Sequence, residues 1–325
     1  MRIFLTGGAG YIGSAAAQML LDAGHQVTIF DSLVTGHRAA VPGRARFIEA
    51  DLTDRAALLQ ALRGDRYEAV LHFAAFIEAG ESMQQPGKYF QNNSVNSLWL
   101  LEACMQAGVT RFVYSSSAAV YASSDEPLTE ESPLRPGNIY GQSKLMTETI
   151  LEWYRRVRGL GYAALRYFNA AGALPGRGEA HQPETHLIPL VLQVALGERK
   201  QVQIFGTDYP TPDGTCIRDY IHLADLVSAH LLALEALEPE KKLVFNVGNG
   251  TGYSVRQVIE TARKATGHAL PAVEAARRPG DPPRLVASSE KIRRELGWSP
   301  QHSELEDIIA SSWEWHRAHP RGYGA

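Results

Sequence analysis

Tyr140 and Lys144 lie four residues apart in a stretch whose pattern predicts a helix over 139–158. Side chains with this spacing share one face of a helix, so the phenol and the ammonium are expected to be neighbours. A tyrosine hydroxyl ordinarily has a pKa near ~10, and a neighbouring ammonium lowers that pKa. Tyr140 is therefore predicted to act as a general base, and Ser117, in a serine run after the strand 111–115, to bind the reacting group. The alternative is a solvated helical face.

A second group of residues has the spacing of a nucleotide-binding turn. Gly7, Gly10 and Gly13 follow an apolar strand and open a helix, where backbone N–H groups can approach a pyrophosphate. Asp31 ends the next strand and is expected to bind a ribose 2′-hydroxyl and to repel a 2′-phosphate. The pattern favours NAD over NADP, and an oxidised nicotinamide would add a second positive charge near Tyr140. A purely structural turn is the alternative.

Further candidates follow the next two strands. Asp51 comes after the strand 46–49, and Phe73, Ala74 and Ala75 end the strand 69–73. Ligands of open parallel sheets bind beyond the carboxyl ends of the strands, so these residues are expected to border the same nucleotide. Asp51 could instead cap the helix that begins near Asp54.

The order of the elements that carry these residues predicts an α/β fold with a Rossmann-type, doubly wound parallel sheet. Strands alternate with helices and are apolar throughout, as expected when helices cover both faces. Strands are predicted at 2–6, 26–30, 46–49, 69–73, 111–115 and 163–168, and helices at 11–22, 55–63, 96–106 and 139–158. We expect an NAD-binding domain over 1–169, to which elements of about 215–250 return. A smaller C-terminal α/β substrate domain would occupy 170–325, with a helix at 187–197 and a strand at 243–247.

Composition excludes several classes of protein. The chain has 325 residues, 45% hydrophobic content and a net charge of −3, so no basic surplus suggests nucleic acid. Apolar runs such as Leu231–Leu237 are far shorter than the ~20 residues of a membrane span. Cys104 and Cys216 lack the spacing of a disulfide framework or a zinc site, and no metal is expected. We expect a soluble cytoplasmic protein.

Six motifs together resemble the extended short-chain dehydrogenase/reductase family, and within it the UDP-glucose (UDP-galactose) 4-epimerases. The resemblance covers nearly the whole chain, and the fifth motif is the most specific because general family members lack it. The motifs are TGGAGYIG (6–13), SSSAAVY (115–121), YGQSK (140–144), RYFNAAGA (166–173), FGTDYPTPDGTCIRDYIH (205–222) and RRPGD (277–281).

The resemblance implies a role for each matching residue. Ser117, Tyr140 and Lys144 would be catalytic. The residues that would bind NAD are Gly7, Gly10, Tyr11, Ile12, Gly13, Asp31, Ser32, Asp51, Leu52, Phe73, Ala74, Ala75, Asn93, Lys144, Tyr167 and Phe168. The residues that would bind the UDP-sugar are Ser117, Tyr140, Asn169, Leu187, Phe205, Arg218, Arg278, Asp281 and Leu285. Two arginines suit a diphosphate, because guanidinium groups bind phosphate oxygens in pairs.

The chain departs from the family pattern at three positions. Ala122 replaces a common glycine, Ile77 stands where some members carry a lysine, and His186 replaces an asparagine that often contacts the diphosphate. These departures affect individual contacts, not the expected reaction. The resemblance also implies a homodimer.

The expected reaction interconverts UDP-galactose and UDP-glucose through a 4-keto sugar, with hydride passing to and from tightly bound NAD. A nucleotide-sugar dehydratase is one alternative, but Ala118 and Ala119 stand where those enzymes place Asp-Glu for proton transfer. A non-catalytic NAD-binding protein would not need the Ser–Tyr–Lys set. A 4-epimerase for N-acetylated or pentose UDP-sugars is the remaining alternative.

Overall fold

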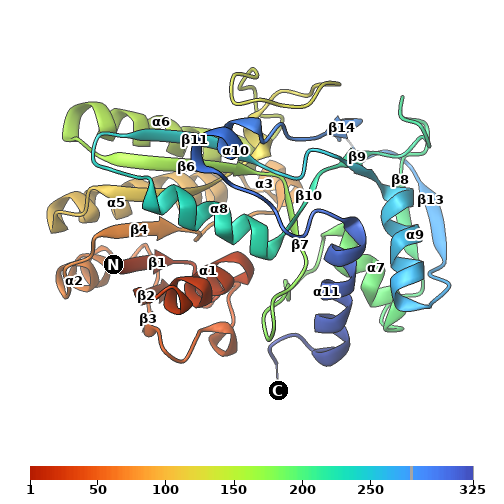
Figure 1. The fold of residues 1–325 in the computed structure, drawn as a ribbon, viewed down its shortest axis with the longest axis horizontal. Coiled ribbons are helices and arrows are strands. Elements are labelled where there is room, and N and C mark those ends of the chain that lie inside the picture. The colour runs from red at the N-terminus through yellow and green to blue at the C-terminus, as the bar shows by residue number, and fades with distance from the viewer. Residues whose placement is uncertain (279–280, 325) are drawn as a thin grey trace. The chain divides into compact units, whose positions relative to one another are not determined.

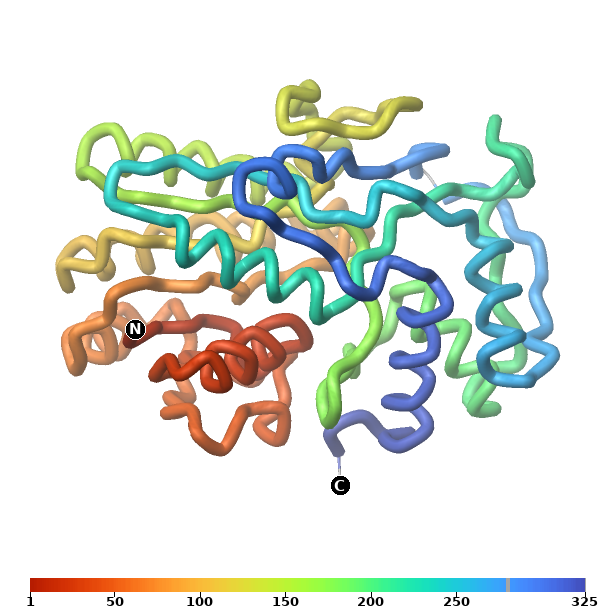
Figure 2. The backbone as a smooth tube through the Cα atoms, in the orientation of Figure 1, coloured from red at the N-terminus to blue at the C-terminus, as the bar shows by residue number. Residues whose placement is uncertain are grey.

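The computed structural model describes residues 1–278 and 281–324, and the chain folds into two compact units. Unit 1 contains Met1–Ala122, Ser132–Arg166 and Val227–Phe245. Unit 2 contains Ser123–Glu131, Tyr167–Leu226 and the residues from Asn246 onward. The backbone leaves unit 1 after Arg166 and re-enters it at Val227 (Figure 2). The sequence-based boundary at residue 169 and the return of about 215–250 stay predictions.

A seven-stranded sheet organises unit 1 (Figure 1). Its order, β3-β2-β1-β4-β5-β6-β11, matches the doubly wound class that the sequence predicted. The pairs that join β1 to β5 are all parallel. The strands are β1 (Arg2–Thr6), β2 (Gln26–Asp31), β3 (Arg46–Glu49), β4 (Ala69–His72), β5 (Arg111–Ser117), β6 (Gly161–Tyr167) and β11 (Lys242–Val247).

Helices cover both faces of this sheet. One face packs against α2 (Arg55–Arg63), α5 (Asn96–Ala107) and α6 (Ile139–Arg158), in a core that includes Leu58, Leu101 and Leu151. Helices α1 (Tyr11–Asp22) and α8 (Leu223–Glu235) lie over the other face (Figure 1). Shorter elements complete the unit: η1 (Arg38–Ala40), α3 (Ala79–Gln84), α4 (Pro86–Tyr89), the π-helix η2 (Phe90–Val95) and η3 (Ala118–Val120). Strands β1, β4 and β5 are buried almost throughout because both faces are covered, whereas the edge strand β3 is not.

Unit 2 is built from shorter strands and its own helical core. Parallel β10 (Tyr220–His222) pairs with β7 (Asn169–Ala171), and β13 (Ala272–Ala275) with β8 (Val202–Phe205). A third sheet joins β12 (Tyr253–Ser254), β9 (Ile217–Arg218) and β14 (Arg284–Leu285). The helices are α7 (Leu187–Ala195), α9 (Val255–Thr266), α10 (Glu290–Leu296) and α11 (Leu305–Ala318). Apolar side chains of α7, α9 and α11, among them Val191, Val258 and Ile309, form the core of this unit.

Among the residues that the structure describes, no helix is long and apolar enough to cross a membrane.

Candidate active site and nucleotide-binding residues

The glycine turn between β1 and α1 is shaped by close backbone contacts. Gly7 has φ +75°, and a Cβ there would lie 2.5 Å from the Ala74 nitrogen. A Cβ on Gly13 would lie 2.1 Å from the Gly7 oxygen. At Gly10, the N-cap of α1, the nearest atom to a Cβ would be 3.4 Å away. Two glycines therefore close the turn, while a Cβ on the third, at the start of the helix, would make only an ordinary contact with the Gly7 oxygen.

Asp31 ends β2 and ties two loops together. Its carboxylate accepts hydrogen bonds from the backbone N–H of Ala9 and of Leu33, both at 2.9 Å. Burial raises the pKa of Asp31, and these two backbone bonds oppose that rise. The side chain is 9% exposed, so it is fixed in place beside the glycine turn and Ser32. Tyr11 and Ile12 begin α1 directly after that turn.

The residues after β3 and β4 border the same edge of the sheet. Asp51 accepts from the backbone N–H and the hydroxyl of Thr53, at 2.8 and 2.7 Å, and buried Leu52 follows it. Asp51 does not cap α2, because Asp54 does so by accepting from the Ala57 N–H at 2.9 Å. The carboxylate of Asp51 thus stands at the strand end and not in a helix cap.

Asn93 is buried in the π-helix η2 and fixes the loop that follows β4. Its side-chain oxygen accepts from the Phe76 N–H, and its side-chain nitrogen donates to the Phe76 carbonyl, both at 2.9 Å. The same nitrogen donates to the Ser143 hydroxyl at 3.1 Å. Asn93 therefore ties Phe76, in the loop after β4, to α6, and its expected contact with NAD stays a prediction.

Ser117 and Tyr140 are brought together by the start of α6. Asn138 caps the helix by accepting from the Gly141 N–H at 2.8 Å. A Cβ on Gly141 would lie 2.1 Å from the Ala119 oxygen, so only glycine lets the helix approach the segment after Ser117. Ser117 ends β5, is 9% exposed, and accepts from the Ala119 N–H at 3.2 Å.

The pKa of Tyr140 is raised in the protein alone. Burial is the largest cause, the hydrogen bond with Ser117 lowers the pKa, and the charge of Glu78 raises it. Lys144 is not among these causes, so the sequence-based expectation that its ammonium lowers this pKa stays a prediction. The ammonium of Lys144 lies 5.8 Å from the centre of the Tyr140 ring and donates to the Ser115 carbonyl at 2.8 Å. Burial lowers the pKa of Lys144 to about 7, against the opposing charge of Glu148.

A buried ion pair behind Lys144 was missed by sequence reasoning. Glu148, one helical turn after Lys144, forms an ion pair with Arg166 at 2.6 Å and accepts from the Ser116 hydroxyl at 2.5 Å. Arg166 also donates to the Tyr121 hydroxyl at 2.9 Å. This network ties α6 to β5 and β6. The i, i+4 spacing of Lys144 and Glu148 was the available signal.

In unit 2, three of the expected substrate residues lie together. β9 and β14 pair in parallel with Leu285 opposite Arg218, and Arg218 lies 3.5 Å from the carboxylate of Asp281. The guanidinium also donates to the carbonyls of Ile217 and Pro282, both at 2.9 Å. Asn169 joins this group, since its side chain donates to the Asp219 carbonyl at 2.9 Å.

The other expected substrate residues of unit 2 form a second group. The Arg278 guanidinium lies 4.0 Å from the centre of the Phe205 ring, at the end of β8. Arg278 is exposed, whereas Leu187 is half-buried at the first position of α7. Tyr167 is the last residue of β6, and Phe168 lies between β6 and β7. Pro279 and Gly280 of the RRPGD motif lie outside the described residues.

Residues 3–248 match the family model described as the NAD dependent epimerase/dehydratase family. The chain belongs to this family. It is 51% identical to the UDP-glucose 4-epimerase of Streptococcus mutans over 99% of both chains. A crystal structure of a UDP-glucose 4-epimerase superposes with a TM-score of 0.96 at 47% identity, with 100% of both chains covered. The Bifidobacterium longum UDP-glucose 4-epimerase, solved with NAD⁺ and UDP, has a TM-score of 0.94 at 36% identity and covers 99% of this chain and 100% of that one.

The most specific motif of this family member contains a structural carboxylate that sequence reasoning did not single out. Asp219 is fully buried and accepts from the backbone N–H groups of Asn249, Gly250 and Ala287, at 2.8 to 3.0 Å. Burial raises its pKa and the three backbone bonds oppose that rise. Asp219 thus holds together the loops next to Arg218.

Two departures from the family pattern have structural outcomes. Ala122 has no positive φ and donates to the Pro133 carbonyl at 2.9 Å, so the missing glycine costs no backbone strain there. His186 is the N-cap of α7 and lies 2.8 Å from the carboxylate of Glu179 and 2.9 Å from that of Glu184. Its imidazole is therefore held by acidic partners.

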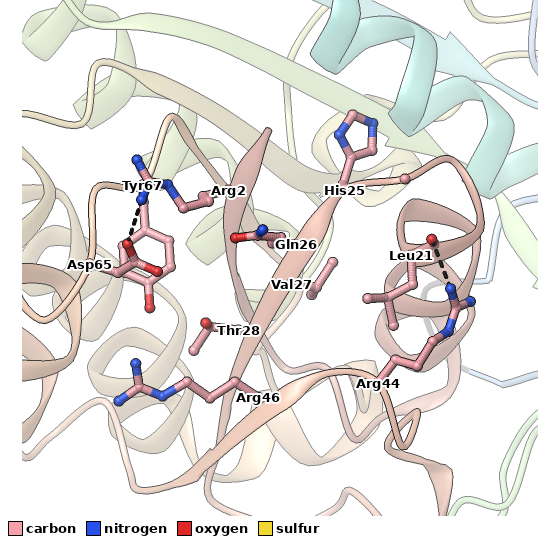
Figure 3. Close-up of a pocket in the computed structure, with 11 residues that line it drawn as sticks. Arg2, Leu21, His25, Gln26, Val27, Thr28, Arg44, Arg46, Asp65 and Tyr67 are labelled. Carbon is pink, nitrogen blue, oxygen red and sulfur yellow. Dashed lines mark hydrogen bonds and ion pairs between the residues drawn. The ribbon is translucent and has the colours of Figure 1, made fainter.

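A cavity of about 480 Å³ lies elsewhere in unit 1 (Figure 3). Its lining includes Arg2 and Gln26, at the amino ends of β1 and β2, and Arg2 there pairs with Asp65 at 3.0 Å. Asp31 and Ser117 stand at the carboxyl ends of their strands. Because those are opposite edges of the sheet, this cavity is not the candidate active site.

Proposed function

We propose that this chain is an NAD-dependent UDP-glucose 4-epimerase that interconverts UDP-galactose and UDP-glucose through a transient 4-keto sugar. The observation that carries the proposal is the assembly of Ser117, Tyr140 and Lys144 in unit 1. Relatives that carry this enzyme's name match almost the full chain.

The turn after β1 fits a dinucleotide. The tight glycine turn at the start of α1 and the fixed carboxylate of Asp31 supply a place for a pyrophosphate and an acceptor for ribose hydroxyls. Asp31 would exclude a 2′-phosphate by charge. When bound, oxidised NAD would take a hydride from C4 of the sugar and return it to the opposite face.

The residues of unit 1 would carry the proton. Tyr140 as phenolate accepts the proton of the sugar 4-hydroxyl and later returns it, while the Ser117 hydroxyl hydrogen-bonds the same oxygen. Since burial raises the pKa of Tyr140, the phenolate needs positive charge from Lys144 and from the bound cofactor. Lys144 is held for this task by Ser115 and by the neighbouring Glu148.

The residues of unit 2 would hold the nucleotide. Arg218 presents a half-buried guanidinium that can pair with phosphate oxygens, and Arg278 lies over the Phe205 ring. Asn169, Leu187, Asp281 and Leu285 are the remaining proposed contacts. With UDP anchored, the 4-keto sugar can turn about its diphosphate linkage so that either face is reduced.

The dehydratase alternative lacks its acid and base. Ala118 and Ala119 form the short helix η3 immediately after Ser117, and neither side chain transfers protons. Activity on N-acetylated UDP-sugars depends on the space near Leu285 and is proposed as a secondary activity.

The test is to incubate the purified protein with UDP-galactose and no added cofactor, and to follow UDP-glucose formation. We expect turnover, and NAD in the supernatant of the denatured protein. A protein that is empty and works only with stoichiometric NADPH would contradict the proposal. Release of water with formation of a 4-keto-6-deoxy sugar would favour the dehydratase.

A cytoplasmic homodimer is proposed for the assembled enzyme. Met146, Trp153 and Val157 are 41, 57 and 66% exposed and recur at spacings of seven and four along α6, which places them on one face. A second copy of this chain would cover that apolar stripe. Trp153→Glu should convert a dimer into a monomer in light scattering, and a wild-type monomer would contradict the proposal.

A further inference from the structure

Two histidines and two glutamates converge in the loop that precedes α7. Glu179, His181, Glu184 and His186 each offer one nitrogen or oxygen atom, and these four atoms lie within 4.8 Å of one another. Glu179 is 5% exposed, and the other three are half-buried. All four belong to unit 2. The cluster is separate from every residue that we assign to NAD or to the reacting sugar hydroxyl.

In both imidazole rings, Nδ1 is the nitrogen that faces the carboxylates. Nδ1 of His186 lies 2.8 Å from Oε1 of Glu179 and 2.9 Å from Oε1 of Glu184. Nδ1 of His181 lies 3.0 Å from that same Glu179 oxygen. The two rings are 5.2 Å apart. One buried carboxylate oxygen therefore faces two inward-pointing imidazole nitrogens, with a second carboxylate beside them.

The charge balance of the cluster calls for a cation. With neutral imidazoles the two carboxylates carry a charge of −2, in surroundings where burial makes an uncompensated charge expensive. Protonated imidazoles could supply the compensation. A divalent ion would supply the same two charges and would need no protonated histidine.

We propose that Glu179, His181, Glu184 and His186 bind one zinc ion. Imidazole nitrogen and carboxylate oxygen are both zinc ligands, and four protein ligands are typical of a structural site. Zinc–ligand bonds of about 2.0–2.2 Å in a tetrahedron require ligand separations of roughly 3.3–3.6 Å. The present separations, from 2.8 to at most 4.8 Å, bracket that range. Small side-chain adjustments would therefore complete the coordination.

The surroundings indicate a structural role. The Glu179 carbonyl accepts from the indole N–H of Trp315 in α11 at 3.2 Å. A Cβ on Gly178 would lie 2.3 Å from Trp315, so the loop is packed tightly against that ring. His186 leads directly into α7. An ion at this point would join the loop to the first turn of α7 and, through Glu179, to α11 within unit 2.

The sequence contains the signal for this site. The four ligands fall within eight residues, in the spacing Glu-x-His-x-x-Glu-x-His. Sequence reasoning considered only the cysteines, and so predicted no metal.

The experiment measures zinc in the full-length holoenzyme, purified without chelators and with any histidine tag removed. Elemental analysis after dialysis should give about one zinc per chain. Competition with a chromophoric chelator, using Zn²⁺ and separately Mg²⁺, should show tight binding of Zn²⁺ alone, because Mg²⁺ prefers oxygen ligands. Glu179→Gln and His181→Asn should each lower the affinity for zinc by about 10–100-fold. The exposed His268→Asn is the matched control and should bind zinc as wild type does.

Circular dichroism and bound NAD identify variants that are folded. Glu179 is buried, so the zinc affinity of Glu179→Gln is interpreted only if this variant folds. His181 is half-buried, so His181→Asn tests the cluster at a less buried position. Zinc removal should also lower the melting temperature of wild type and leave that of His181→Asn unchanged. A wild type that holds no zinc, or that binds it no better than the variants do, would overturn the site and leave two protonated imidazoles as the compensating charges. Neither readout depends on epimerase activity.

Discussion

The two units differ in how they hold the residues assigned to function. In unit 1 these residues stand at the ends of neighbouring strands of four to seven residues and on a helix of 20 residues, and Lys144 is 2% exposed. In unit 2 they stand on strands of two to four residues and on loops, where Arg218 and Asp281 pair with each other at 3.5 Å. We therefore expect the regular structure of unit 1 to position proton transfer, and the short strands and loops of unit 2 to position the flexible, charged nucleotide.

The division predicts that chemistry and nucleotide affinity can be damaged separately. Loss of a group in unit 1 should reduce turnover, and loss of a group in unit 2 should weaken UDP binding. The variants below test that separation, from the largest expected effect to the smallest.

Tyr140→Phe should give the largest effect. It removes only the hydroxyl that carries the proton, and general base catalysis contributes about 10²–10⁴-fold, so kcat should fall by that factor. UDP affinity, measured by calorimetry, should stay within about twofold of wild type, since unit 2 is untouched. A loss of turnover below about tenfold would place the general base at another residue. A loss of UDP affinity as large as the loss of kcat would contradict the division of chemistry and nucleotide binding between the two units.

Arg218→Ala should weaken UDP binding with a smaller effect on turnover at saturation. Hydrogen bonds to charged groups contribute about 1.5–3 kcal/mol, which corresponds to roughly 10–150-fold in affinity. Arg218→Lys should recover only part of the affinity, because an ammonium cannot form the paired contacts of a guanidinium. Arg278→Ala is the comparison, and its effect should be smaller because that side chain is exposed. If Arg218→Ala lowers kcat alone, the nucleotide role of unit 2 fails.

A pair of variants in unit 1 should move the pH profile in opposite directions. The pKa of Tyr140 is raised mainly by burial, is lowered by Ser117 and is raised by Glu78. Because the active form is the phenolate, a higher pKa moves the acidic limb of kcat/KM to higher pH. Ser117→Ala should therefore move that limb upward and Glu78→Gln should move it downward.

The measurement is the pH profile of kcat/KM for both variants, by stopped-flow or steady-state kinetics. Glu78→Gln should keep most of the activity at high pH, since Glu78 acts on the pKa through charge alone. Limbs that both move upward, or that do not move, would show that Tyr140 is not the group titrating in the profile.

The contrast between the regular elements of unit 1 and the short strands and loops of unit 2 also explains what the sequence could predict. The strands at 2–6 and 46–49 and the helices at 11–22, 55–63 and 139–158 match the structure, because local apolar patterns and, for the last two helices, the capping residues Asp54 and Asn138 specify them. The strand of Arg111 was predicted to end at Ser115 and instead continues to Ser117, which puts the reactive hydroxyl on the strand itself. Unit 1 was thus largely predictable.

Unit 2 was less so. β9, β12 and β14 have two residues each, too few to show a periodicity, and they exist because Asp219 and neighbouring backbone groups hold their loops together. The effect of burial on the pKa of Tyr140 was also beyond sequence reasoning, because tertiary packing decides how deeply the phenol is buried. The four-residue cluster before α7 was visible in the sequence but not considered.

Leu285→Tyr should have the smallest effect and should refine the role of unit 2. Leu285 is half-buried opposite Arg218, and only its backbone takes part in the β9–β14 pairing, so a larger side chain leaves that pairing intact. A leucine leaves room for an N-acetyl group whose methyl can pack on it, and a tyrosine would fill that room. We expect activity on UDP-N-acetylgalactosamine to fall about tenfold while activity on UDP-galactose stays within about twofold. Leu285→Met, which conserves volume, should spare both activities. Equal loss on both sugars would make Leu285 a core residue, and a wild type inactive on the N-acetylated sugar would remove this pocket assignment.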